Sequence, residues 1–123
     1  MNVIIAIFIG GGLGSISRFG ISRLIHSNFQ DINPVGTFAA NFISTLLLGV
    51  FLYFAGQKVI FSSTLKALLI IGFCGGFSTF STFSYETFEL LKKGYYWFAA
   101  ANLMLSMTLG LIALFFLAKT VKL

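Results

Sequence analysis

The sequence is poor in charged and titratable residues. Charged residues make up 9% of its 123 residues, and it holds three acidic residues, one histidine, one proline and one cysteine. A single cysteine, Cys74, excludes an internal disulfide and is expected to be a small core residue. No histidine, cysteine or carboxylate cluster suited to a metal ion or to acid–base chemistry is present, and His26 lies in a predicted loop. We therefore expect no enzyme.

Apolar residues dominate instead. They account for 58% of the chain, and the mean hydropathy is +0.98, which is typical of an integral membrane protein. A helix needs about 20 apolar residues to cross the hydrocarbon core, and four segments are long enough. We expect a single all-α membrane domain over residues 1–123 with spans at about 3–25, 35–55, 65–91 and 95–118. The first segment is longer than the core of a signal peptide, so we expect it to be a retained span.

The basic residues bear on partners and on topology. The net charge is +5, but the basic residues are scattered, which argues against nucleic acid and fits lipid headgroups or a small anion. Four predicted spans place both termini on one side of the membrane. The two sides then carry four basic residues each: Lys58, Lys66, Lys119 and Lys122 against Arg18, Arg23, Lys92 and Lys93. Such a balance favours insertion in both orientations and an antiparallel homodimer, with a single orientation as the alternative.

The third segment contains a run that lipid would not tolerate. Residues 75–86 hold two glycines, six hydroxyl-bearing side chains and one carboxylate. The pair Gly75-Gly76 and the hydroxyls after it predict a broken helix near 75–79, whose freed carbonyls need protein or a cation as a partner. Phe80 and Phe83 are three residues apart and share a helical face, which indicates either packing or ring edges turned toward an anion. Glu86 could be a proton site, a hydrogen-bond partner or a cap.

Polar residues in the other spans admit two interpretations each. The glycines at positions 10–12 and 14 predict close helix packing. Arg18 either snorkels to the interface or lines an electropositive vestibule. Asn41, with Thr37 and Ser44 on the same face, either makes interhelical hydrogen bonds or donates to an anion. Asn102, Ser106 and Thr108 offer weaker versions of the same choice in the fourth span.

At these residues the sequence resembles the Fluc family of fluoride channels, also called CrcB proteins. The likeness covers essentially the whole chain. Its specific points are the glycine-rich first span with Arg18, the sequence Asn33-Pro34-x-Gly36-Thr37 leading to Asn41, and the run Gly75-Gly76-x-Ser78-Thr79-Phe80-Ser81-Thr82-Phe83-Ser84-x-Glu86.

The resemblance implies a passive, fluoride-selective channel that exports cytoplasmic fluoride and so relieves its toxicity, in a bacterial inner membrane. It implies an antiparallel dual-topology homodimer with two pores and a central sodium ion held by the backbone carbonyls of Gly75 and Ser78. It places Phe80, Phe83 and Asn41 in the pore and Arg18 near the vestibule. It also assigns a polar track to Ser81, Thr82 and Ser84, with Ser106 and Thr108 as candidates from the fourth span, where the family often has an aromatic residue or a histidine.

Two other functions fit a short four-span chain. A proton-coupled small multidrug-type exporter would need a membrane carboxylate as its exchange site, and Glu86 is the only candidate. Its position late in the third segment, rather than in the first, argues against that function. A purely structural subunit is disfavoured because the small and hydroxylated residues concentrate in a single span.

Overall fold

The computed structural model describes residues 2–25, 34–56 and 61–121, which are almost entirely helical and contain no strand. The elements are α1 (Val3–Ile25), α2 (Pro34–Gly56), α3 (Ser63–Lys66), the π-helix η1 (Ala67–Cys74), α4 (Gly75–Phe77), α5 (Phe80–Lys92) and α6 (Tyr96–Val121). α3, η1, α4 and α5 together form one span, Ser63–Lys92. Four helical segments are therefore long and apolar enough to cross a membrane, which confirms the predicted all-α, four-span architecture.

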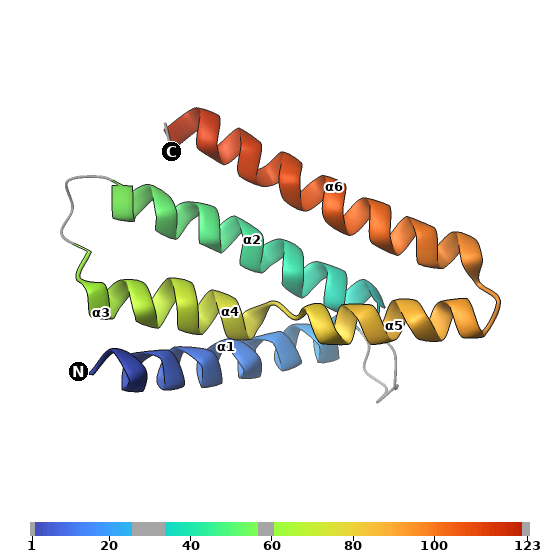
Figure 1. Ribbon diagram of the computed structural model, residues 1–123, viewed down its shortest axis with the longest axis horizontal. Coiled ribbons are helices and arrows are strands. Elements are labelled where there is room, and N and C mark those ends of the chain that lie inside the picture. Colours follow the sequence, from blue (N-terminus) through green and yellow to red (C-terminus); the bar gives the residue numbers. More distant parts are fainter. Residues whose placement is uncertain (1, 26–33, 57–60, 122–123) are drawn as a thin grey trace.

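The spans lie side by side, with both chain ends at the same end of the molecule (Figure 1). α1 packs chiefly along η1 and α4, whereas α2 packs against α6 and α1. The third span thus contacts α1 through its first half and α6 through α5. Asn33, His26, Lys58 and Lys122 lie outside the described residues.

Local sequence signals set the ends of the third span. Ser62 precedes the first helical residue, and its side chain accepts a hydrogen bond of 3.1 Å from the amide of Leu65. At the other end Gly94 has a φ of +85°, a conformation that glycine adopts readily and that ends a helix. The observed span, Ser63–Lys92, agrees with the predicted segment at about 65–91. Exposed aromatic side chains follow at Tyr96 and Trp97, where α6 begins.

Glycine allows α1 and the third span to approach closely. Gly10 and Gly14 are buried on α1. A methyl group at Gly10 would collide with the carbonyl oxygen of Leu68, and one at Gly14 with that of Phe73. Gly12, in contrast, has open space around it. The expected packing role is therefore confirmed for Gly10 and Gly14.

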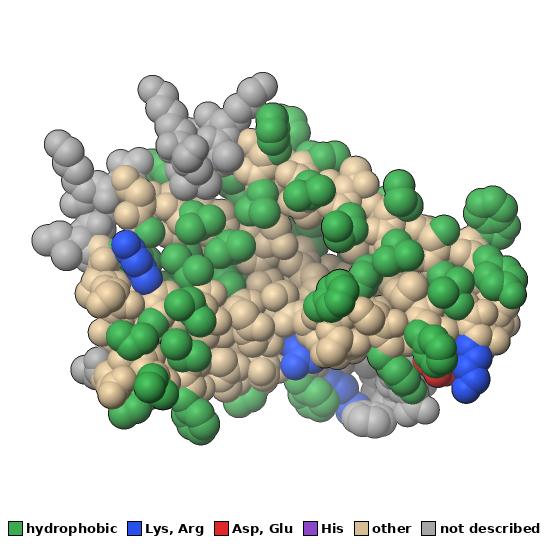
Figure 2. Space-filling model, in the orientation of Figure 1, with side chains coloured by type: hydrophobic (Ala, Val, Ile, Leu, Met, Phe, Trp, Pro, Cys, Tyr) green, Lys and Arg blue, Asp and Glu red, His purple; other side chains and the backbone are tan. Residues whose placement is uncertain are grey.

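Most of the molecular surface is apolar. Large hydrophobic side chains are exposed on every span; Phe8 on α1 and Trp97 on α6, for example, are 81% and 89% exposed. Figure 2 shows such side chains spread over the visible face, with lysine and arginine side chains appearing only in small groups. This is the surface expected of a chain surrounded by lipid.

Candidate functional site

The third span is interrupted near its middle. Ser78 and Thr79 have extended backbone conformations, with ψ angles of 156° and 120°, so α4 ends at Phe77 and α5 begins at Phe80. The predicted break is therefore present, at the carboxyl-terminal end of the predicted range 75–79. Gly75 and Gly76 differ from the expectation because both are helical. Gly76 instead lies against the backbone of Gly11, where a side chain would not fit.

Hydrogen bonds from hydroxyl groups stabilise the two helix ends at this break. The hydroxyl of Ser78 donates to the carbonyl of Cys74 over 3.0 Å, and so does the hydroxyl of Ser44 from α2. On the α5 side, Thr79 Oγ1 accepts from the amide of Thr82 at 3.2 Å, as an N-cap residue does. The Cys74 carbonyl also keeps its helical donor, the amide of Ser78, at 3.1 Å. The amide of Thr82, in contrast, gains a side-chain acceptor in place of the Ser78 carbonyl that it would pair with in an unbroken helix.

Asn41 joins the break to α2 through both ends of its amide. Its Oδ1 accepts from the backbone N–H of Thr79 at 2.8 Å, and its Nδ2 donates to the Thr79 carbonyl at 3.4 Å. Asn41 therefore makes the interhelical hydrogen bonds that were one of the two interpretations of its sequence position. The bond that Asn41 donates is the longer and weaker of the two. Its Nδ2–H group is therefore the one that could donate to an incoming acceptor instead of the Thr79 carbonyl.

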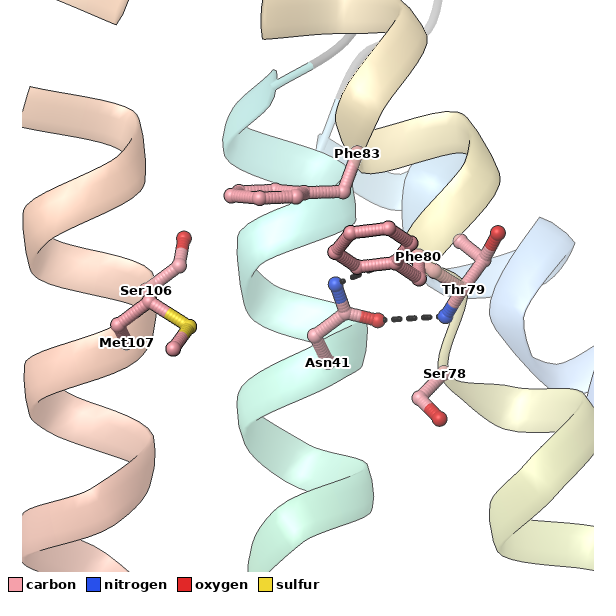
Figure 3. Close-up of a pocket in the computed structure, with 7 residues that line it drawn as sticks. All are labelled: Asn41, Ser78, Thr79, Phe80, Phe83, Ser106 and Met107. Carbon is pink, nitrogen blue, oxygen red and sulfur yellow. Dashed lines mark hydrogen bonds between the residues drawn. The ribbon is translucent and has the colours of Figure 1, made fainter. Parts of the chain in front are cut away.

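A cavity of about 220 Å³ adjoins this contact. It is lined by Asn41, Ser78, Thr79, Phe80, Phe83, Ser106 and Met107, none of which is charged. The rings of Phe80 and Phe83 have centroids 6.3 Å apart and are tilted by 38°. Ser106 lies on α6, across the cavity from Thr79 and Phe80 (Figure 3). Its Oγ is shielded from solvent and makes no hydrogen bond to any described residue. The cavity thus offers amide, hydroxyl and aromatic groups together.

A second cavity, of about 400 Å³, lies on the other side of the break. Its lining residues are Ser44, Thr45, Leu48, Ile70, Ile71, Cys74, Gly75 and Ser78, so Ser78 borders both cavities. In a continuous α-helix the amide of Thr79 would donate to the carbonyl of Gly75, and that of Thr82 to Ser78. Here those amides donate to Asn41 and to the Thr79 side chain. The carbonyls of Gly75 and Ser78 therefore lose their usual helical donors.

The structure brings four of the predicted pore residues together: Asn41, Phe80, Phe83 and Ser106. The predicted track residues lie beside this cavity rather than in its lining. Ser81 and Ser84 are exposed on α5, whereas Thr82 is half-buried and bonded to Thr79. In a single chain the track therefore lies on an open surface of α5.

The remaining candidates lie outside both cavities. Arg18 is half-buried, and its Nε donates to the carbonyl of Gly76 at 3.3 Å. Glu86 is 2% exposed and is the largest fully buried side chain. Thr108 is exposed on α6. None of these three residues lines the cavity that contains Phe80 and Phe83.

Sequence reasoning missed three contributors to the site. Thr79 is the backbone partner of Asn41, and Met107 completes the cavity wall. Thr87 donates to the carbonyl of Phe83 at 2.9 Å and accepts from the amide of Asn102 at 3.2 Å, which ties α6 to α5 one turn from the aromatic pair. The four-residue spacing from Phe83 to Thr87 is the signal for the first of these bonds.

Known proteins resemble this chain in sequence over most of its length. Residues 5–117 match the family described as "CrcB-like protein, Camphor Resistance (CrcB)". A "Fluoride-specific ion channel FluC" from Coxiella burnetii is 41% identical over 110 residues, covering 89% of this chain and 88% of the relative. Relatives with the same name from Bacteroides fragilis and Pyrococcus horikoshii are 40% and 41% identical over 116 residues, covering 92% and 93% of this chain and 91% of each relative. The chain therefore belongs to the CrcB family.

Proposed function

We propose that this chain is a passive channel that lets fluoride leave the cytoplasm and so relieves its toxicity. The observation that carries the proposal is the uncharged cavity at the break, where Asn41, Ser106 and two phenylalanine rings converge at the middle of a membrane span. The relatives named as fluoride-specific ion channels support the choice of ion. The chain is thus a multi-pass inner-membrane protein and not an enzyme.

The chemistry of the cavity suits a small, strongly hydrated anion. Its water shell must be replaced by donors for the ion to pass. The Nδ2–H group of Asn41 and the hydroxyl of Ser106 are such donors, and neither carries a charge that would hold the ion too tightly. The edges of Phe80 and Phe83 carry partial positive charge and add attraction without any hydrogen-bonding capacity. Ser81, Thr82 and Ser84 on α5 extend the hydroxyl surface beyond the cavity.

A negative interior drives the export. Moving one elementary charge across 100 mV is worth about 2.3 kcal/mol, and the sign favours exit of an anion. No coupled proton is required. A proton-coupled small multidrug-type exporter gains no support from the family match, and its exchange carboxylate, Glu86, is buried away from both cavities.

We expect liposomes containing the purified full chain, loaded with potassium fluoride and supplied with valinomycin, to release fluoride rapidly. A fluoride electrode measures the release, and a chloride electrode on matched liposomes gives the selectivity. Release without a pH gradient and without comparable chloride release supports the channel. No release, equal chloride release, or release only with a proton gradient contradicts it.

The functional unit we propose is an antiparallel homodimer. Phe80 is 79% exposed in the single chain, and Gly75, Ser81 and Ser84 are also exposed near the middle of the third span. Hydroxyl groups at that depth need protein or water rather than lipid beside them. A second copy, inverted as the balanced basic residues allow, would cover this surface and close the pathway along α5.

The same dimer would place two breaks near each other, and the residues present fit a sodium ion between them. Oxygen ligands suit hard cations. The carbonyls of Gly75 and Ser78 have lost their helical donors, and both residues border the second cavity. The ion would supply positive charge that holds the two breaks together.

We expect Gly75→Ala to weaken the dimer without disturbing the fold of one chain. A methyl group at Gly75 meets nothing within 4 Å in the single chain, so only a second copy would be crowded. Gly110→Ala on α6 is the matched control, because Gly110 has equally open surroundings. The measurements are the dimer fraction in detergent and the rise in melting temperature when sodium replaces N-methylglucamine. A dimer and a sodium effect that survive Gly75→Ala argue against both assignments.

A further inference from the structure

Arg18 contacts the broken span at a backbone group that the break deprives of its partner. In a continuous helix the carbonyl of Gly76 would accept a hydrogen bond from the amide of Phe80. That bond cannot form here because Ser78 and Thr79 are extended and α4 ends at Phe77. The Nε–H of Arg18 donates to this carbonyl at 3.3 Å instead.

This contact lies outside the cavity at the break. Arg18 does not line the cavity that contains Asn41 and the phenylalanine pair. Its partner, Gly76, lies three residues before Thr79, the residue that both ends of the Asn41 amide hold. The segment between them is therefore fixed from two helices, by Arg18 on α1 and by Asn41 on α2.

We propose that Arg18 is a positioning residue whose Nε–H replaces the lost helical donor to Gly76, and that donation, rather than attraction of anions by its charge, is its main contribution. An arginine inside a span is costly unless it is paired, and a backbone carbonyl is one of its usual partners. Fixing the Gly76 peptide holds the extended residues in the geometry that presents Thr79 to Asn41. The inference rests on the proposed fluoride conduction.

Three substitutions at this position separate donation from charge. In Arg18→Gln the amide nitrogen is bonded to Cδ, as Nε is in arginine, so a neutral donor sits at the same distance along the side chain. Arg18→Lys keeps the charge, but its nitrogen lies one bond farther out and a methylene group takes the place of Nε. Arg18→Met removes both properties while keeping an unbranched side chain of similar length.

We expect Arg18→Gln to conduct fluoride within about twofold of the unmodified chain. Arg18→Lys and Arg18→Met should each lose about tenfold, the cost of one part-buried carbonyl left without a donor. Both should also lose selectivity for fluoride over chloride, which a loss of folded protein alone would not change. Arg23→Gln is the control, because this arginine lies on the same helix with its guanidinium 5.9 Å from the ring of Phe19; its flux should be unchanged.

Amide hydrogen exchange provides a readout independent of conduction. Exchange in residues 76–82 should accelerate in Arg18→Lys and Arg18→Met but not in Arg18→Gln. Conduction retained by Arg18→Lys and lost by Arg18→Gln, or equal behaviour of all three variants, overturns the proposal. If Arg18→Gln folds and inserts while Arg18→Lys and Arg18→Met do not, the role of donation is supported. If Arg18→Gln is the one variant of the three that does not fold, that role is refuted. An unmodified chain without fluoride flux would refute the proposed function, whereas the exchange pattern would still decide the role of Arg18.

Discussion

Replacing Asn41 with alanine is expected to lower fluoride efflux by about a hundredfold. The substitution removes the acceptor for the Thr79 amide and the donor for the Thr79 carbonyl, which lie 2.8 and 3.4 Å from the Asn41 side chain. Each unsatisfied backbone group costs about 1–3 kcal/mol, and about 1.4 kcal/mol corresponds to a tenfold change. The same change deletes the amide donor at the cavity. Efflux from liposomes, normalised to reconstituted protein, is the measurement.

Asn41→Asp separates the two roles of the amide. The carboxylate retains an acceptor for the Thr79 N–H but loses the donor and adds a negative charge where an anion must pass. We expect a folded protein with no measurable fluoride flux. Ser17→Ala is the control, since the Ser17 hydroxyl bonds to the carbonyl of Leu13 in its own helix and to no other residue in the described part of the chain. Near-normal flux in Asn41→Ala or in Asn41→Asp would remove Asn41 from the pathway.

Local signals in the sequence predicted the framework of the fold. Apolar length located the four spans. In the structure the ends of the third span are set by the side chain of Ser62 and by the left-handed Gly94, features that act within a few residues. The position of the break was also predictable, since glycine and hydroxyl groups weaken a membrane helix over a short range.

Features that depend on contacts between spans were not predictable. The π-helix Ala67–Cys74 has no marker in its own sequence, which is a plain apolar run. The glycines at 75–76 remain helical, and Gly76 packs against the backbone of Gly11. Whether Asn41 bonds to another span or faces an ion could not be decided from spacing, because the answer depends on Thr79, which lies 38 residues later.

The two phenylalanines also looked equivalent in the sequence, but the fold treats them differently. Phe83 is 6% exposed, whereas Phe80 is 79% exposed in the single chain. Both line the cavity beside Asn41. The buried ring has its environment fixed by this chain alone. The exposed ring must acquire part of its surroundings from a second copy if the proposed dimer forms.

Phe83→Ile is expected to lower fluoride flux by about tenfold and to reduce the preference for fluoride over chloride. Isoleucine preserves apolar bulk but has no ring edge with partial positive charge. A tenfold loss corresponds to about 1.4 kcal/mol. Phe80→Ile should act similarly. The double substitution should cost less than the sum of the two, because the ring centroids are only 6.3 Å apart and the residues act together. Paired fluoride and chloride efflux measurements test each variant.

Phe88→Ile on α5 is the matched control for this series, because that ring is 58% exposed and lines neither cavity at the break. It should leave flux and selectivity unchanged. Phe77→Ile is a second control: Phe77 is 3% exposed in the core, so its loss should lower the melting temperature without changing the ratio of fluoride to chloride flux. A selectivity loss shared by Phe77→Ile and Phe83→Ile would mean that general packing, rather than the ring edges at the cavity, determines which anion passes.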